Sequence, residues 1–287
     1  MHLFLEQLLN GIATGSIYAL VTLGLALVYG ILRILHVAHA AVYTIGAYIG
    51  VMLFNLTGSL IAAVVGSMAV SAVVGVAIER FVYFPLLKYP PFVPLIGSIA
   101  VFLSVEELCR LVAGPQILTF PARLPFPEFQ VGGVTVSSTL TAVYCITAGV
   151  LLLLWFVTTR TELGLAMRAA SQDIAVADAM GIDSHFIVSV TFVIGSAVAA
   201  LAGMLVGIYY NQVYPTMGAI PAYKTLALIV VGGLGSVPGA VAAALLLGMA
   251  ETLLIGFANI PLPRDALAFI AMIVVLMWRP QGLLGSR

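Results

Sequence analysis

Residues Leu9–Leu32 read LNGIATGSIYALVTLGLALVYGIL, an uncharged run of hydrophobic and small residues. A helix needs about 20 such residues to cross the hydrocarbon core of a membrane. Similar runs recur along the 287-residue chain, which is 62% hydrophobic and 8% charged, whereas soluble domains are roughly 45–50% apolar and about 25% charged. Because the runs are continuous rather than alternating, we predict an all-α, polytopic transmembrane helical bundle.

Nine apolar segments are expected to form the spans. They are Leu9–Leu32, Ala38–Leu56, Leu60–Ile78, Phe92–Ala113, Leu140–Val157, Phe186–Tyr210, Ala222–Leu234, Ala240–Ala258 and Ala266–Trp278. The seventh is short and ends in the glycine- and proline-rich GGLGSVPG, which favours a half-helix or re-entrant element, and the second could be broken near its start. We therefore expect about 8–10 spans in a single transmembrane domain, residues 1–287.

The distribution of lysine and arginine predicts the orientation, since cytoplasmic loops carry an excess of both. With residues 160–183 placed inside, the inner side receives Arg33, Arg80, Lys88, Arg160, Arg168, Arg279 and Arg287. The outer side receives Arg123, Lys224 and Arg264. This orientation puts the segment Gly114–Ser138 outside and the C-terminus in the cytoplasm, as expected of a multi-pass membrane protein.

One long polar segment interrupts the apolar runs, at residues 159–183, TRTELGLAMRAASQDIAVADAMGID. Thr161 is expected to cap a short helix, Asp173 to cap a second one, and Gly181 to end it. From the residues alone, this pair of helices is either an interfacial loop on the bilayer surface or a docking surface for a soluble partner.

A motif in this segment carries a family resemblance. Its residues are Thr161, Leu163, Gly164, Ala166, Arg168, Ala169, Gln172, Asp173, Ala175, Val176, Ala177, Gly181 and Ile182. Their order and spacing resemble the cytoplasmic E-A-A-x-x-x-G region of permease subunits of branched-chain amino acid ABC importers, with Ala175 in place of the glutamate. GGLGSVPGA and the terminal RPQGLLG also resemble that family.

The resemblance implies a transport subunit rather than an enzyme. Its implied partners are two cytoplasmic ATPase subunits, a second permease that is homologous or identical, a periplasmic solute-binding protein and membrane lipid. The chain has no G-x-x-x-x-G-K-[ST] phosphate loop, so we expect no cofactor bound directly and ATP used by the partner subunits. The implied ATPase-coupling residues are Thr161, Leu163, Gly164, Arg168, Asp173, Ala177 and Gly181.

Polar residues within or beside the spans are candidates for the substrate path. They are His39, Tyr43, Asn211, Tyr214, Tyr223, Lys224 and Glu251. Lys224 could meet a substrate carboxylate or reach to the membrane interface, and Glu251 could line a path or hold a helix contact. Glu106 and Arg110 are expected to pair on one helix face, with Glu107 free to pair with another helix.

The solute expected from the resemblance is a branched-chain or related amino acid carried inward, with a urea or amide ABC permease as the alternative. A secondary transporter or a channel for a small solute are further alternatives. No catalytic or metal site is expected because the sequence lacks a nucleophile–base arrangement and a ligand cluster. The net charge of +0 suggests no nucleic-acid partner.

Overall fold

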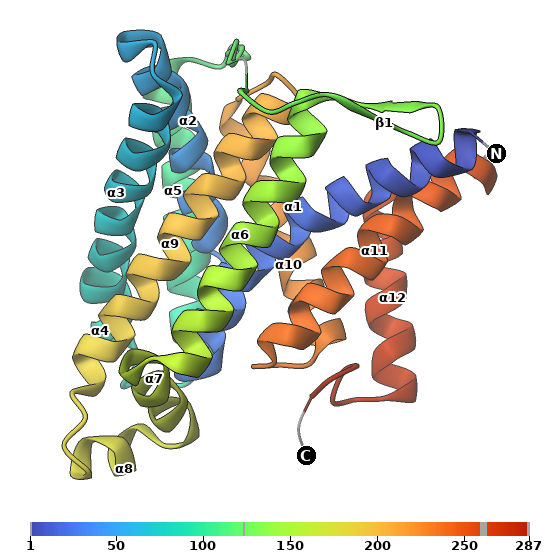
Figure 1. The fold of residues 1–287 in the computed structure, drawn as a ribbon. Coiled ribbons are helices and arrows are strands. Elements are labelled where there is room, and N and C mark those ends of the chain that lie inside the picture. Colours follow the sequence, from blue (N-terminus) through green and yellow to red (C-terminus); the bar gives the residue numbers. More distant parts are fainter. Residues whose placement is uncertain (1, 123, 259–262, 286–287) are drawn as a thin grey trace.

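The computed structural model describes residues 2–122, 124–258 and 263–285, and its architecture is a bundle of long helices (Figure 1). The α-helices are α1 (His2–Leu32), α2 (His39–Thr57), α3 (Leu60–Ile78), α4 (Phe84–Leu86), α5 (Phe92–Ala113), α6 (Ser138–Arg160), α7 (Glu162–Gln172), α8 (Ile174–Ala179), α9 (Ser184–Tyr209), α10 (Ala219–Gly232), α11 (Val237–Ala258) and α12 (Arg264–Trp278). A π-helical turn (Glu79–Tyr83) joins α3 to α4, and a 3-10 turn (Pro215–Gly218) precedes α10. The strands β1 (Phe129–Val131) and β2 (Val134–Val136) form an antiparallel hairpin.

The nine predicted segments all fold as helices, most of them within a few residues of the predicted ends. In the described part of the chain, 8 helices are long and apolar enough to cross a membrane, and α12 is shorter. This agrees with the prediction of a polytopic bundle of about eight to ten spans.

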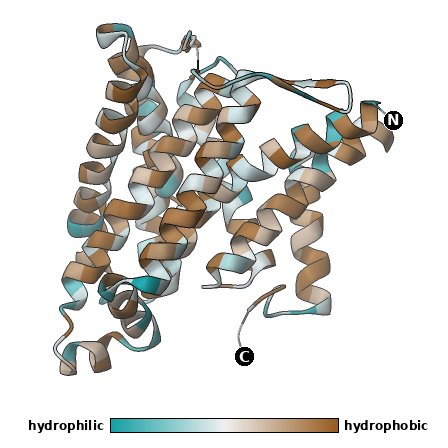
Figure 2. Cartoon of the chain, in the orientation of Figure 1, coloured by the Kyte–Doolittle hydropathy of each residue, from teal (hydrophilic) through white to brown (hydrophobic). Residues whose placement is uncertain are grey.

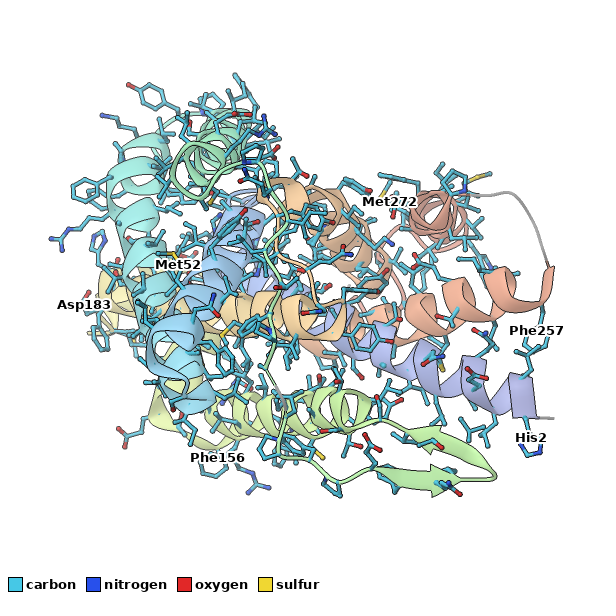
Figure 3. All side chains as sticks on the ribbon, turned by 90° about the horizontal axis from the view of Figure 1, so that it is seen from above. His2, Met52, Phe156, Asp183, Phe257 and Met272 are labelled. Carbon is cyan, nitrogen blue, oxygen red and sulfur yellow. The ribbon has the colours of Figure 1, made fainter. Side chains whose placement is uncertain are left out.

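Helices α1 and α9 form the centre of the bundle. Helix α1 contacts α6, α9, α10 and α11, while α9 contacts α2, α3 and α6 as well as α1. Seen from above, α9 lies between α2 and α6, and α1 leads obliquely from it alongside α11, with α12 on the far side of α11 (Figure 3). Helix α5, on the outside, is the least buried of the candidate spans, so most of its side chains are available to lipid.

Small residues allow these central helices to approach closely. A Cβ on Gly46 of α2 would lie 2.3 Å from the Cα of Ala200, and one on Gly203 of α9 would lie 2.1 Å from the carbonyl oxygen of Tyr43. Gly15 of α1 approaches Leu245 of α11 in the same way. These glycines therefore serve packing within the chain, where close backbone contact replaces a hydrophobic driving force.

The two ends of the bundle differ in their connections. The β-hairpin and the N-terminus lie at one end, and α7, α8 and the C-terminal segment lie at the other (Figure 1). Figure 2 shows a hydrophilic stretch on α7 beneath largely hydrophobic helices. The predicted placement of the 114–138 and 159–183 segments at opposite ends is therefore confirmed, although Arg123 and Arg287 lie outside the described residues.

The segment predicted as a half-helix is α10, which ends at Gly232 before the glycine-rich break, as predicted. Together with the preceding 3-10 turn Pro215–Gly218, however, it is 18 residues long and counts as a candidate span. The end at Gly232 is covered by the C-terminal segment. The backbone N–H groups of Leu283 and Leu284 donate to the carbonyls of Val231 and Gly232, at 2.8 and 3.0 Å. These bonds satisfy carbonyls that a helix end otherwise leaves without partners, so RPQGLLG serves as a cap for α10.

Glu107 on α5 does not pair as the sequence predicted. Arg110 pairs with Glu106 at 3.6 Å, as expected, but also with Glu107 at 2.8 Å. Residues three and four apart on a helix are both neighbours on its surface, and one arginine fork reaches both carboxylates. Glu107 therefore pairs within its own helix rather than with another one.

Candidate functional site

Helices α7 and α8 are held by the caps that the sequence predicts. The Thr161 hydroxyl accepts from the Gly164 N–H at 3.1 Å and donates to the Val157 carbonyl at 2.6 Å. The Asp173 carboxylate accepts from the N–H groups of Ala175 and Val176 at 2.9 and 3.1 Å. Each cap satisfies N–H groups in a first helical turn, so the two helices meet at the single residue Asp173.

The turn after α8 needs a glycine. Gly181 has φ +87°, in the left-handed region, and the Ile182 N–H donates back to the Ala177 carbonyl at 3.0 Å, as in a Schellman helix end. The Ser184 N–H donates to the Asp178 carboxylate at 3.1 Å. Hydrogen bonds from the side chain and the backbone of Ser184 lower the pKa of Asp178 below its usual value. Asp183 then caps α9 by accepting from the Phe186 N–H at 3.0 Å.

The segment has one face on the bundle and one face away from it. Gly164, Met167, Ala170 and Ala177 are buried, whereas Leu165, Val176 and Met180 are 62%, 58% and 78% exposed. Arg168 holds the inner face by donating to the carbonyl of Thr158 in α6.

The predicted coupling residues divide between these faces. Arg168, Asp173 and Gly181 are exposed, Thr161 and Leu163 are intermediate, and Gly164 and Ala177 are buried. The two buried residues face the bundle.

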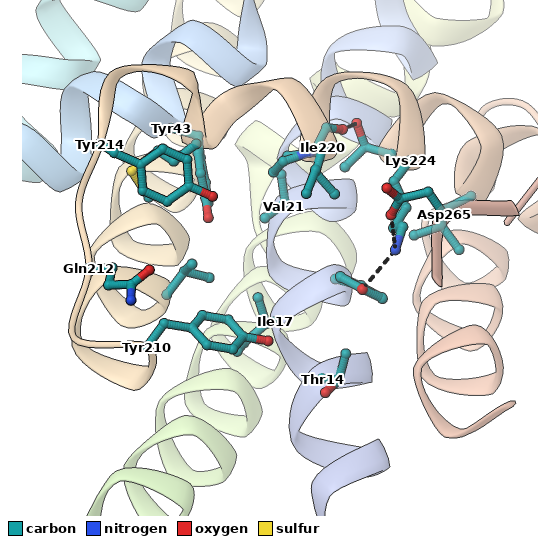
Figure 4. Close-up of a pocket in the computed structure, with 16 residues that line it drawn as sticks. Thr14, Ile17, Val21, Tyr43, Tyr210, Gln212, Tyr214, Ile220, Lys224 and Asp265 are labelled. Carbon is teal, nitrogen blue, oxygen red and sulfur yellow. Dashed lines mark hydrogen bonds and ion pairs between the residues drawn. The ribbon is translucent and has the colours of Figure 1, made fainter. Parts of the chain in front are cut away.

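A cavity of about 270 Å³ lies between α1, α9, α10 and α12 (Figure 4). Three predicted path residues line it: Tyr43, Tyr214 and Lys224. In Figure 4, Tyr43, Tyr210 and Tyr214 lie on one side and Lys224 and Asp265 on the other, with Ile17 and Val21 of α1 between them. Polar side chains therefore form two opposite walls, with Ile17 and Val21 between them.

Buried charges form the Lys224 wall. The Lys224 ammonium lies 3.0 Å from a Glu251 oxygen, 3.1 Å from an Asp265 oxygen and 2.9 Å from the Tyr18 hydroxyl. Tyr18 in turn donates to Glu251 at 2.9 Å, and Tyr223 donates to Asp265 at 2.7 Å. We call Tyr18, Tyr223, Lys224, Glu251 and Asp265 the Lys224 cluster.

The cluster bears on two alternatives that the sequence left open. Lys224 is only 2% exposed, so it neither reaches to the membrane interface nor belongs to an outer loop. Glu251 holds a helix contact, because it joins α11 to α10 and α1. Tyr18 and Asp265 were not among the predicted path residues, although Asp265 carried a signal as an acidic residue that opens an apolar segment.

His39 and Asn211 lie outside this cavity lining. His39 is buried, and its Nε2 lies 3.0 Å from the Val21 carbonyl. The Asn211 side chain accepts from the Phe120 N–H at 3.0 Å, and its own φ is +52°. Both contacts join separate segments of the chain, so the structure gives these two residues packing roles.

Comparison with known proteins agrees with this architecture. Residues 7–277 match the family model described as branched-chain amino acid transport system, permease component. The chain belongs to this permease family. It is therefore a membrane transport subunit, not an enzyme, and it is one component of a transport system.

Two relatives match the permease along nearly its whole length. BraD of Pseudomonas aeruginosa, a high-affinity branched-chain amino acid transport system permease protein, is 35% identical over 98% of this chain and 96% of its own. LivH of Escherichia coli K12, with the same description, is 32% identical over the same shares.

A solved structure has a similar fold. The structure of PsaBC from Streptococcus pneumoniae in complex with Fab matches with a TM-score of 0.50 and 14% identity, over 96% of the permease and 90% of the matched chain. At this identity the likeness concerns the arrangement of helices alone.

Proposed function

We propose that the chain is the permease subunit of an ABC importer that carries branched-chain amino acids inward across the bacterial cytoplasmic membrane. The observation that carries the proposal is the full-length similarity to BraD and LivH, whose names state that substrate class. Two cytoplasmic ATPase subunits bind and hydrolyse ATP, a second permease completes the path, and a periplasmic protein delivers the solute. The C-terminus lies in the cytoplasm.

The α7–α8 segment is the proposed contact with an ATPase subunit. Its inner face is bonded to α6 and α9, whereas Leu165, Val176 and Met180 point away from the bundle. Exposed apolar side chains beside polar ones are typical of a protein-docking surface. Because capped helices anchored on two spans move as a rigid piece, the segment is suited to pass ATPase closure on to the bundle.

Gly181→Val is expected to uncouple the importer. The left-handed backbone at Gly181 disfavours a Cβ by roughly 1 kcal/mol or more, and a β-branched residue by most, so the turn after α8 should shift the docking surface. A Cβ there meets no atom within 4 Å, which leaves the bundle itself undisturbed. We expect normal abundance but reduced leucine uptake by proteoliposomes, with ATP hydrolysis that no longer responds to loaded binding protein.

Gly181→Asn is the matched control, because asparagine tolerates the left-handed conformation far better than valine. It should retain most of the uptake. Wild-type uptake and coupled hydrolysis in Gly181→Val would exclude a coupling role for this turn. If the wild-type complex moves no leucine at all, the proposed substrate is wrong.

The orientation can be measured with an impermeant thiol reagent in intact cells. In a background lacking Cys109 and Cys145, single cysteines replace Gln130 in the β-hairpin and Gln172 at the end of α7, both of which are exposed. The inner excess of basic residues predicts labelling at position 130 and protection at position 172 until the cells are permeabilised. Labelling at 172 alone would invert the orientation.

A further inference from the structure

A groove of about 680 Å³ lies between α1, α6, α7 and α11, and it shares no lining residue with the cavity beside Lys224. Helices α6 and α11 each pack against α1, whereas they do not pack against one another in the described part of the chain. Helix α1 therefore forms the floor of the groove, and α6 and α11 form its sides. Helix α7 closes one end, because it contacts both α1 and α6.

The floor and sides of the groove are largely apolar and lie at membrane depth. Leu152 and Trp155, on the α6 side, are 66% and 54% exposed. The lining residues extend from 23 to 31 on α1 and from 151 to 159 on α6, which is roughly 12 Å along each helix. Half of the hydrocarbon core of a bilayer is about 15 Å thick. The groove is therefore nearly as long as the acyl-chain layer of one leaflet.

Positive charge gathers at the α7 end of the groove. Arg168 lines the groove and donates to a backbone carbonyl of α6. Arg33 donates at 3.4 Å to the carbonyl of Ser171, which is another lining residue. The Arg160 guanidinium lies 5.7 Å from the centre of the Trp155 ring. All three arginines are exposed, so an anion at this end of the groove can reach them.

The three arginines have no carboxylate partner among the described residues, where the ion pairs are those of Arg110 and Lys224. The acidic residues of the 159–183 segment are turned to other tasks. Three of them accept from backbone N–H groups of α8 and α9, namely Asp173, Asp178 and Asp183.

The face of α7 on the groove is free of acidic residues. Its lining residues are spaced three and four apart, as on one face of a helix, and they are Gly164, Met167, Arg168 and Ser171. Glu162, on another face of α7, does not line the groove. The groove thus combines an apolar length with a basic end.

We propose that this groove binds an anionic phospholipid, with an acyl chain along α1 and the headgroup phosphate at Arg33, Arg160 and Arg168. A soluble anion would match the arginines but would leave the apolar length uncovered, whereas a phospholipid supplies both parts. Basic pockets between membrane helices on the cytoplasmic side bind such headgroups, and the proposed orientation places α7 on that side. The lipid joins α7 to the spans and so steadies the seat of the docking segment.

The test uses Trp155 as a reporter at the groove. The chain has two tryptophans, so Trp278→Phe leaves Trp155 as the only one in the full-length permease. Bromine atoms on lipid acyl chains quench tryptophan fluorescence on contact. In phosphatidylcholine bilayers, we expect brominated phosphatidylglycerol to quench Trp155 at about fivefold lower mole fraction than brominated phosphatidylcholine, the preference that one arginine near an anionic lipid supplies.

Two variants at Arg168 separate its charge from its hydrogen bond. Arg168→Gln keeps an N–H donor for the carbonyl of α6 but loses the charge, and it should lose most of the fivefold preference. Arg168→Lys keeps the charge and should retain the preference. Gel filtration and the helical circular dichroism signal check that each variant is folded.

A matched pair of phenylalanines tests the apolar length of the groove. Gly30 lines the groove, and a Cβ there meets only the Gly235 carbonyl oxygen, at 3.9 Å, so Gly30→Phe should fill the groove without a backbone clash and abolish the preference. Gly149 lies on α6 outside the lining, and a Cβ there meets nothing within 4 Å. Gly149→Phe should therefore behave as the parent does.

Four results would overturn the proposal. They are equal quenching by the two lipids in the parent, an unchanged preference in folded Arg168→Gln, an unchanged preference in folded Gly30→Phe, and no quenching by either lipid, which would mean that protein covers the groove. Loss of the preference on adding soluble glycerol 1-phosphate would likewise show an anion site that needs no lipid chain.

These outcomes are independent of the solute. Leucine uptake by the complete importer together with equal quenching by the two lipids would reject the lipid site and leave the proposed function intact. A fivefold preference in a permease whose complex moves no leucine would do the reverse.

Discussion

Lys224→Met is expected to lower the free energy of unfolding by about 3–5 kcal/mol, since removing one partner of a buried ion pair leaves the other charge uncompensated. Glu251, 2% exposed, would keep only the hydrogen bond from Tyr18. Asp265 would suffer less, because it is 35% exposed and still accepts from Tyr223. The shift can be measured as the midpoint of unfolding when SDS is added to the permease in bicelles.

The double variant Lys224→Met/Glu251→Met distinguishes an ion pair from simple packing. Replacing both buried charges by apolar groups of similar volume is often close to neutral, so we expect most of the lost stability to return. Glu251→Met alone should be destabilising, because Lys224 then loses its buried counter-charge and keeps the partly exposed Asp265 and the Tyr18 hydroxyl. If the two single effects instead add in the double variant, the pair contributes no coupling of its own.

Gly164→Ala is expected to abolish coupled transport although it adds only one methyl group. The new Cβ would lie 2.2 Å from the Val157 carbonyl oxygen and 2.4 Å from that of Thr158. Both are backbone atoms of α6, so α7 must move away and weaken the contact between Arg168 and Thr158. Overpacking of this kind typically costs about 1–3 kcal/mol, and it falls on the joint between the docking segment and the bundle.

Gly149→Ala supplies the control in α6, the helix whose backbone Gly164 approaches, since a Cβ at Gly149 meets nothing within 4 Å. It should leave unfolding and leucine uptake at wild-type values, because alanine is a better helix former than glycine. Both variants are assayed for uptake and for ATP hydrolysis stimulated by binding protein. Equal behaviour of the two would mean that the α6–α7 contact plays no part in transport.

The contrast between Gly164 and Gly181 required the tertiary structure. Both glycines stand in the same motif, and the sequence marks Gly181 as the end of a short helix. Its open surroundings and φ of +87° are a local property of the turn. Gly164 is restricted instead by the backbone of a preceding helix, and no local pattern reveals that contact.

The order of the elements was readable from the sequence because membrane helices depend on local terms. A span must satisfy its backbone hydrogen bonds internally, so an uncharged run such as Leu60–Ile78 becomes helix α3 with the same bounds. Caps act between residues two or three apart, and for this reason Thr161 and Asp173 were predicted correctly. The 114–138 and 159–183 segments lie at opposite ends of the bundle because a single span, α6, separates them.

What joins residues distant in the sequence was decided by packing alone. The Lys224 cluster brings together Tyr18, Lys224, Glu251 and Asp265 from four helices, and hydropathy records each of them only as a polar residue in an apolar setting. Their pairing depends on how α1, α10, α11 and α12 approach one another, which small residues such as Gly15 allow. The sequence by itself therefore determined the spans, the caps and the family. The tertiary structure decided which wall of the cavity carries charge, because an ion can be buried in a membrane protein only where another helix supplies its partner.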